Sequence, residues 1–515
     1  MQSSLKPDWR RLIRSMKIHK TGRMAKALLA GSAMLLALNV SGCSAQNGTE
    51  GQDSKLQNSE YLFVSEGNSA ERLNPQSGGA DKESKKLREA IMNTKDELEL
   101  EGGTVYYISS LNGDDYNVGT SPDAAWETLS AYSNIRKELK PGDIILFERG
   151  GVYRGNLILA SGVTYGAYGY GPKPAIYGSE ENYSGKNYME ENYWTKTKKE
   201  NVWVCSEYVS DDIGTIVFDH GRAVGKRIFS KMENMEENFE FYHDAETAQV
   251  YLYLEQDPSE AFYDIEFCVR GDILHGRANV SNVTINNLSV KYGGSHGIGF
   301  ENGANHITIT NCELGWIGGS LMDETVRYGN GIEFWDNCSD ILVENNWVYQ
   351  IYDAGITHQG DDIGGYVQSD ITYRGNLVEY CNYGFEYFTG NPEKDLWKNI
   401  LYEDNIIRFS GYGWSVVRPD PAMISIICGW GHTDPFKAEN FVIKNNIFDI
   451  STNYIIAQHY NADMPVEFIG NTYYQREGKV AYWSYKTELL TTNQETFEKA
   501  VSEIDSDPKL VKFLK

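Results

Sequence analysis

The stretch Asn330-Gly-Ile-Glu-Phe-Trp-Asp336 returns in altered form as Ala354-Gly-Ile-Thr-His-Gln-Gly360 and again as Tyr383-Gly-Phe-Glu-Tyr-Phe388. Each copy has a glycine at its turn and then alternates apolar and polar residues. Alternation with a period of two predicts a strand with one buried face, and glycine permits the tight turn before it. A phrase of this kind that keeps returning predicts a stack of similar coils.

A second phrase accompanies the first and ends each time in Asn, Asp or Gly. Its copies end 24 to 41 residues apart and lie at 283–287, 307–311, 341–345, 371–375, 400–404, 441–445 and 466–470. A fixed minimum spacing with variable excess indicates a constant coil with loops of different length. The chain lacks a helix pattern after each strand, which excludes crossover-helix folds, and its repeats are too short for propeller blades. We therefore predict an all-β fold, a right-handed parallel β-helix whose closing residues form a polar ladder.

Composition narrows the class of ligand. The chain has 515 residues and a net charge of −25, and residues 1–43 carry eight Lys or Arg residues but one acidic residue. The rest of the chain is therefore more acidic than the whole. Such a body lacks the cations that nucleic acid requires, so we expect no nucleic-acid partner. A neutral ligand and a monomeric protein fit this charge best.

The N-terminus has the features of an export signal. A basic segment precedes an apolar stretch at 27–40, which is short for a spanning helix, and Val40-Ser41-Gly42-Cys43 follows. This ending resembles a bacterial lipobox, which implies cleavage before Cys43 and lipid attachment to its thiol. The protein would then face the cell exterior or the periplasm, with the lipid as its contact with the membrane. Ordinary secretion with an incidental cysteine is the alternative.

The remaining chain divides by composition and rhythm. Antiparallel strand patterns interrupt the coils between 178 and 275, either as a functional module or as a structural flap. Six further cysteines lack C-x-x-C spacing, so we expect buried free thiols, with a single disulfide as the alternative. The predicted segments are a signal peptide (1–43), a flexible tether with one short helix (44–100), an N-terminal cap and first coils (101–177), an inserted β-module (178–275), the β-helix core (276–490) and a C-terminal capping helix (491–515).

Alignment of the first phrase places two carboxylates in one outward column. Glu333 and Glu386 occupy it with Thr357 between them. Coils about 4.8 Å apart would separate the two backbones by roughly 9–10 Å, near the separation of the two carboxyls in inverting glycosidases. One acid could protonate a leaving oxygen while the other activates water. The alternative is a pair of solvated glutamates on an open sheet.

Further candidates surround this column. We expect carboxylates to act as substitutes if the register slips by one residue, and aromatic or polar side chains to bind substrate. His358 alternates inward, so it is either buried or turned toward the ligand by a bulge. The substitutes are Asp353, Asp361 and Asp362, and the predicted substrate-binding residues are Trp335, His358, Gln359, Phe388, Trp414, Trp430 and His432.

The region from about 105 to 510 resembles right-handed β-helix (pectin-lyase-like) carbohydrate-active enzymes. The resemblance implies a poly- or oligosaccharide substrate and, on the paired carboxylates, a glycoside hydrolase. A polysaccharide lyase or epimerase on uronic-acid polymers and a non-catalytic glycan-binding surface protein are the alternatives. Gly360-Asp361-Asp362 is similar to the paired aspartates of pectin hydrolases, but no Arg-x-Lys follows. We expect no cofactor other than calcium, for which Asp361 and Asp362 are candidate ligands.

Overall fold

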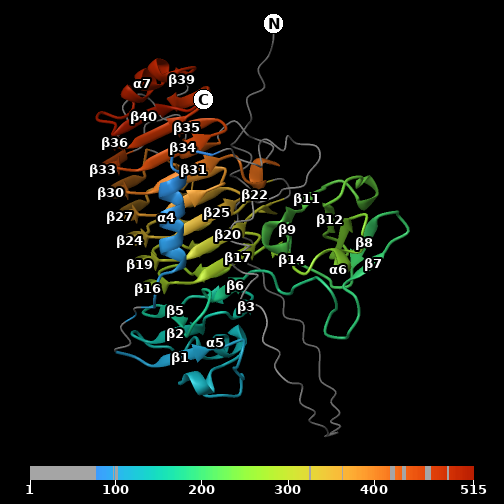
Figure 1. Cartoon of the computed structure of the whole chain (residues 1–515). Coiled ribbons are helices and arrows are strands. Elements are labelled where there is room, and N and C mark those ends of the chain that lie inside the picture. The colour runs from blue at the N-terminus through green and yellow to red at the C-terminus, as the bar shows by residue number, and fades with distance from the viewer. Residues whose placement is uncertain are drawn as a thin grey trace, which may run out of the picture. The chain divides into compact units, whose positions relative to one another are not determined.

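The computed structural model describes residues 77–515 except 97, 99–101, 324–325, 362, 392, 418–423, 432–436, 459–465 and 484–486. In this part of the chain, three long sheets stack coil upon coil as a parallel β-helix (Figure 1). Sheet 1 runs through β1 (Val105–Ile108), β2 (Ile144–Glu148), β5 (Thr164–Tyr168), β16 (Ser281–Asn286), β19 (Asn305–Thr310), β24 (Ser339–Glu344), β27 (Val367–Arg374), β30 (Leu396–Glu403), β33 (Lys437–Lys444) and β36 (Val466–Ile469).

The other two sheets close each coil. Sheet 2 runs through β10 (Ala223–Val224), β9 (Ile213–Phe218), β14 (Ile265–Val269), β17 (Ser289–Gly293), β20 (Glu313–Ile317), β25 (Trp347–Ile351), β28 (Leu377–Glu379), β31 (Ile406–Ser410), β34 (Ile447–Ser451), β37 (Thr472–Gln475) and β40 (Leu510–Phe513), with β3 (Val152–Arg154) and β6 (Ala175–Tyr177) branching from it. Sheet 3 runs through β4 (Leu157–Ile158), β15 (Leu274–Gly276), β18 (Ile298–Phe300), β23 (Ile332–Trp335), β26 (Ala354–Gly360), β29 (Tyr383–Thr389), β32 (Ser425–Gly431), β35 (Tyr454–Gln458), β38 (Gly478–Trp483) and β39 (Thr487–Thr491).

Apolar side chains at alternate positions of each strand fill the interior of the coils. In sheet 3, Ile298, Ile332, Ile356 and Phe385 pair in register and are fully buried, as the sequence predicted. The next residue in this column is Ile427 of β32 rather than Trp414. Trp414 instead begins the 3-10 helix η4 (Trp414–Val417), because the coil between β31 and β32 carries a long loop that the repeat pattern does not locate.

The predicted polar ladder is present at the turn between sheets 1 and 2. In the coils of the ladder, the strand of sheet 1 is followed by a residue with a left-handed backbone conformation, such as Asn345 (φ 55°). Gly, Asn and Asp adopt this conformation more readily than other residues. The following asparagine is buried and donates its amide to the next one, with Nδ2–Oδ1 distances of 2.9 to 3.0 Å from Asn346 as far as Asn471. Asp505 accepts the last of these bonds and ends the ladder. Each rung therefore satisfies buried polar groups of its neighbours.

Helices cover the ends of the stack and one of its faces. The short helix α5 (Leu129–Ile135) lies at the N-terminal end, and α7 (Gln494–Ser502) lies at the C-terminal end. The capping box of α7 is formed by Asn493 and Thr496. Over the described residues, no helix is both long and apolar enough to cross a membrane.

Helix α4 (Asp81–Met92) is the short helix predicted within residues 44–100, but it is packed against the fold rather than part of a free tether. The helix lies along the face of sheet 2 in Figure 1. Its N-cap residue Ala80 and its Ile91 side chain belong to a buried hydrophobic cluster there. Arg88 forms a 2.6 Å ion pair with the buried Glu379, and Arg408 contacts Asp81 of the helix. This part of the predicted flexible segment is therefore a packed element of the fold, whereas residues 44–76 lie outside the described part of the chain.

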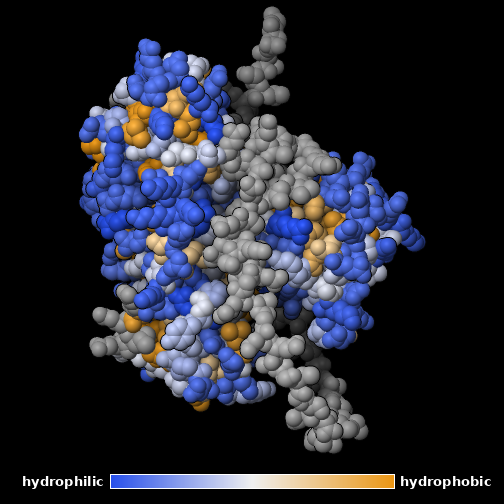
Figure 2. Space-filling model, in the orientation of Figure 1, coloured by the Kyte–Doolittle hydropathy of each residue, from blue (hydrophilic) through white to orange (hydrophobic). Residues whose placement is uncertain are grey.

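The inserted module is a sheet of its own beside the stack (Figure 1). Its strand order is β7 (Trp194–Lys196), β8 (Val202–Cys205), β13 (Gln249–Tyr253), β12 (Glu240–Asp244) and β11 (Lys226–Arg227), and its pairs are antiparallel except β11–β12. The strand β9 lies in the same sequence segment but joins sheet 2, where it pairs antiparallel with β14. Figure 2 shows an apolar area on this module within a largely hydrophilic surface.

The six cysteines from Cys205 to Cys428 are free and buried, as the sequence predicted.

Candidate functional site

The outward column of sheet 3 has the register that the sequence predicted. Glu333 of β23 pairs with Thr357 of β26, which pairs with Glu386 of β29. The residue on the next strand is Cys428. Both glutamates are almost fully buried, with 5% and 7% of their surfaces exposed. They are therefore not solvated side chains on an open sheet, and each needs partners for its carboxylate.

A histidine from the preceding coil is the partner of Glu333. Nδ1 of His296 lies 2.5 Å from Oε2 of Glu333, and Asn330 donates from Nδ2 to the same oxygen over 3.3 Å. Burial would lower the pKa of His296, but the carboxylates of Glu333, Asp272 and Asp353 together raise it to about 9. The imidazole is therefore positively charged at neutral pH, and Glu333 is held next to a fixed cation.

Glu386 is held by neutral donors. Gln359 donates from Nε2 to Oε2 of Glu386 over 2.7 Å, and the Thr357 hydroxyl reaches the same oxygen at 3.4 Å. Gln359 also contacts Thr357, so the three side chains form one network on neighbouring strands. The network fixes the direction of the carboxylate.

A carboxyl that the sequence analysis did not single out lies at the end of β23. Asp336 accepts a 3.0 Å hydrogen bond from the backbone N–H of Asp361, on the next coil. A Cβ on Gly360 would lie 3.4 Å from Oδ1 of Asp336 and 3.5 Å from Oδ2 of Asp395. The two carboxyls therefore both face the space beside Gly360. Glycine at 360 leaves the space between them open.

The environment of Asp336 favours its protonated form. Burial is the largest cause that raises the pKa of Asp336 from 3.8 to about 7. The amide of Asp361 opposes this rise, while the negative charges of Asp361, Asp395 and Glu333 add to it. A carboxyl with a pKa near 7 can hold and release a proton at physiological pH, which is what a general acid requires.

Asp395 has a different environment from Asp336. One of its oxygens accepts the backbone N–H groups of Gly365 and Tyr366, at 2.8 and 3.1 Å, and the other accepts the Thr389 hydroxyl. Asp395 thus anchors the loop 363–366, and this loop brings the Tyr366 ring next to Gly360. Burial and the neighbouring carboxylates raise the pKa of Tyr366, so its hydroxyl stays protonated and can donate a hydrogen bond.

The second outward column carries the predicted substrate-binding side chains. Trp335, Gln359 and Phe388 pair in register across β23, β26 and β29, and the backbone of Trp430 continues the column in β32. Trp335 and Phe388 are partly exposed, so their rings are available to the C–H faces of a ligand.

Two predicted binding residues are buried elsewhere, which corrects the sequence interpretation. His358 points into the core, is fully buried and stacks against Tyr373, and burial lowers its pKa to about 3. Trp414 packs against Tyr352 and donates from Nε1 to the carbonyl of Gln350 over 2.8 Å. Neither side chain can contact a ligand at the outer face of sheet 3.

The remaining predicted residues are placed as follows. Asp353 is half-buried and lies close enough to His296 to raise its pKa, so it belongs to the Glu333 side of the site. Asp361 is half-buried beside Asp336, and its carboxylate accepts the N–H of Ile363. Cys43, Asp362, His432 and the side chain of Trp430 lie outside the described residues. Among the residues that are described, no group of three or more His, Cys, Asp or Glu side chains is arranged to hold a metal ion.

The sequence contained weak signals for the residues that the analysis missed. Asp336 closes the repeat phrase that contains Glu333. His296 precedes the turn glycine of the coil before, at the position that Asn330 occupies in the phrase. Their contacts join different coils, however, and the loops that separate the coils vary in length.

Comparison with known proteins agrees with the fold. The family described as "Right handed beta helix region" matches residues 276–425. A lacto-N-biosidase of Bifidobacterium longum subsp. longum is 50% identical over 48 residues, which cover 9% of this chain and 3% of that protein's length. A solved glycoside hydrolase matches 80% of this chain and 96% of its own, with 10% identity and a TM-score of 0.40. A pectate lyase matches 74% of this chain and 76% of its own, with 12% identity and a TM-score of 0.38.

Proposed function

We propose that this protein is a carbohydrate-active enzyme, and more specifically a glycoside hydrolase that acts at the outer face of sheet 3. The observation that carries the proposal is a pair of carboxyls in different electrostatic environments. Asp336 has a pKa of about 7, whereas Glu333 lies 2.5 Å from a positively charged His296. Two carboxyls whose environments separate their protonation states are the usual acid and base of glycoside hydrolysis.

The proposed mechanism assigns one task to each side chain. Asp336 gives its proton to the glycosidic oxygen as the bond to the anomeric carbon breaks. Glu333, held as an anion, removes a proton from the attacking water or stabilises the positive charge on the sugar. Trp335 and Phe388 would contact the C–H faces of the sugar rings, and the Tyr366 hydroxyl would donate to a substrate oxygen near Asp336.

Glu386 offers a second assignment for the anionic role, and variants distinguish the two. The full chain is screened against plant and microbial polysaccharides and aryl glycosides, with a reducing-end assay and ultraviolet absorbance as readouts. We expect new reducing ends without ultraviolet absorbance, and loss of turnover in Asp336→Asn and Glu333→Gln. Glu439→Gln is the matched control, because Glu439 is an exposed carboxylate on β33, where it lies 3.8 Å from Lys398.

Each other outcome assigns a different function. Turnover that survives Glu333→Gln but not Glu386→Gln moves the anionic role to Glu386. An unsaturated, ultraviolet-absorbing product identifies a lyase, and a change of sugar configuration without cleavage identifies an epimerase. Saturable glycan binding without turnover identifies a binding protein. Dialysis against a chelator tests calcium at Asp361 and Asp362, and activity that survives dialysis removes that hypothesis.

We also propose that the chain is exported and anchored by a lipid on Cys43, and that the folded part is monomeric. Metabolic labelling with a radioactive fatty acid should label the wild-type protein and not Cys43→Ser, which should be released in soluble form. Equal labelling of both would contradict the anchor. Light scattering of the released protein should give the mass of one chain, and a larger mass would contradict the monomer.

A further inference from the structure

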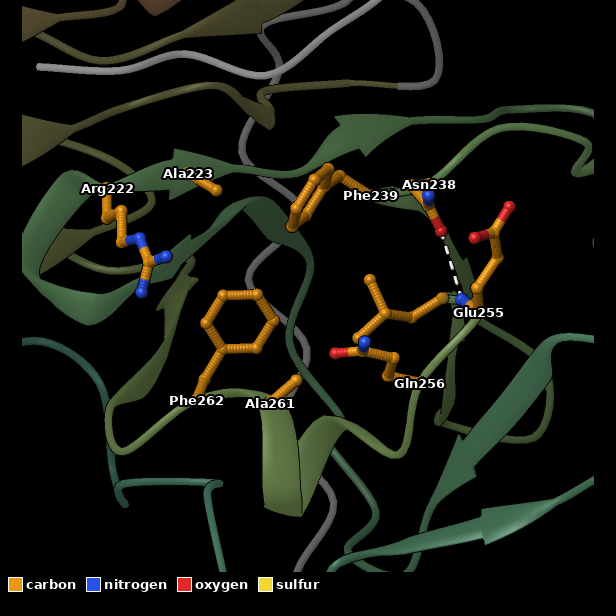
Figure 3. A pocket seen from close by; sticks show the side chains of 9 residues that line it. Arg222, Ala223, Asn238, Phe239, Glu255, Gln256, Ala261 and Phe262 are labelled. Atoms are coloured by element: carbon orange, nitrogen blue, oxygen red, sulfur yellow. Dashed lines mark hydrogen bonds between the residues drawn. The ribbon is translucent and has the colours of Figure 1, made fainter.

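The inserted module contains a cavity of about 350 Å³ that the proposed catalytic site does not use (Figure 3). It lies between the strand β10, the segments that precede β12 and follow β13, and the short helix α6 (Pro258–Ala261). Its lining residues all fall between 222 and 262, and sheet 3 contributes none of them. The volume is at the lower end of the range of small-molecule sites.

Aromatic and aliphatic side chains form the floor of this cavity. Phe239 and Phe262 point toward each other across it in Figure 3, with ring centroids 6.0 Å apart at 60°, and Leu254 lies beside them. Phe218 packs behind Phe262 at 4.8 Å and holds the ring in place. Both lining rings are partly exposed, so they offer preformed apolar surface to a ligand.

The backbone of Phe239 fixes the direction of its ring. Its φ is 72°, in the left-handed region. The strand partners hold it there, because its N–H donates to the Tyr253 carbonyl and its carbonyl accepts the N–H of Lys226. Gly or Asn would suit this conformation, but neither would place a ring in the cavity.

The rim supplies hydrogen-bonding groups of both kinds. Asn238 accepts the N–H of Glu255 through Oδ1, which leaves its Nδ2 facing away from this bond (Figure 3). The Gln256 amide extends over the cavity, and the Arg222 guanidinium lies on the opposite side, in a loose 3.4 Å contact with Asp219. Amide groups both donate and accept, which matches neighbouring hydroxyls. The charge of Arg222 is balanced by Asp219, and the Glu255 carboxylate points away from the cavity in Figure 3.

We propose that this cavity is a second carbohydrate-binding site, specific for a neutral sugar residue. The two phenylalanine rings would lie against the C–H faces of the sugar, and Asn238, Gln256 and Arg222 would bind its hydroxyls. The acidic body of the protein (net charge −25) disfavours an anionic sugar. The module would thereby hold a glycan chain while the site on sheet 3 acts on it. The binding itself does not depend on the proposed catalytic residues.

The test is ligand-observed saturation-transfer NMR on the full chain carrying Asp336→Asn. The probes are glucose, galactose, xylose, N-acetylglucosamine, lactose and cellobiose, each titrated singly. We expect at least one of them to bind, and to bind at least about tenfold more weakly in Gln256→Ala and in Phe239→Asn. Phe239→Asn removes the ring but suits the left-handed backbone, so the module should stay folded. Glu439→Gln, at an exposed carboxylate on β33 outside both sites, should leave this binding unchanged.

Three results would overturn the proposal. One is that none of the sugars binds. Another is that binding is lost in Trp335→Ala but survives both module variants, which would move it to sheet 3. The third is that an apolar dye, 1-anilinonaphthalene-8-sulfonate, binds to the wild type and not to Phe239→Asn while no sugar displaces it. Failure of hydrolysis would leave the NMR result intact, so the two proposals fail separately.

Discussion

Replacing Asp336 by asparagine should remove a proton donor and keep the shape of the side chain. A general acid typically contributes about 10²–10⁴-fold to the rate, so kcat should fall by that factor. The loss should be much smaller for substrates whose leaving group needs no protonation, such as glycosyl fluorides. Because Asp336 must be protonated to act, wild-type activity should fall as pH rises through about 7. The residual activity of Asp336→Asn should lack this alkaline decline.

The same substitution should stabilise the fold by an amount that depends on pH. The pKa of Asp336 is raised from 3.8 in the unfolded chain to about 7 in the fold, so the charged form is the one that folding disfavours. The cost is absent below pH 4, grows between pH 4 and 7, and is complete above 7. The full shift corresponds to at most about 4 kcal/mol of unfolding free energy. Because water partly screens the carboxyl, we expect roughly 1–3 kcal/mol.

Urea unfolding at pH 4.5 and pH 8, followed by near-ultraviolet circular dichroism, measures this difference. Asp336→Asn and wild type should be nearly equal at pH 4.5, and the variant should be more stable at pH 8. Glu439→Gln, on the exposed face of β33, should follow the wild type at both values. The reasoning is refuted if the variant keeps the alkaline decline in activity, or if its stability relative to wild type does not change with pH.

Three further predictions concern the supports of the site. Asn376→Ala removes a fully buried side chain that makes four hydrogen bonds in the ladder. Thermal unfolding should therefore show that the free energy of unfolding falls by roughly 3–5 kcal/mol, and a fall of under 1 kcal/mol would contradict the ladder's role. Arg408→Met leaves the buried Asp449 carboxylate without the ion pair that lies at 3.0 Å, so we expect about 3–5 kcal/mol of destabilisation and faster proteolysis within α4; unchanged cleavage there would contradict it. His296→Gln removes a cation whose pKa is raised to about 9, so its stabilisation should be full below pH 6.5 and disappear as pH rises through 9, and a deficit independent of pH would contradict the ion pair with Glu333.

The repeat was predictable because it is local. Alternation identifies which residue of a strand faces inward, and this placed Ile332, Ile356 and Phe385 in one column and Glu333 and Glu386 in the other. The prediction failed at the next strand, because η4 (Trp414–Val417) precedes β32, which begins only at Ser425. The alternation of residues within a strand carries no information about the length of the connection between two strands.

The sequence by itself determined the stacked β-fold, the polar ladder and the outward carboxylate column, because each follows from the order of apolar, polar and turn residues within a single coil. Only the tertiary structure decided how the carboxyls differ. His296 reaches Glu333 from another coil, and Asp336 is buried beside Asp361 and Asp395 from two others. A carboxyl's protonation depends on burial and on charges within a few ångströms, and both are set by loops that bring distant residues together.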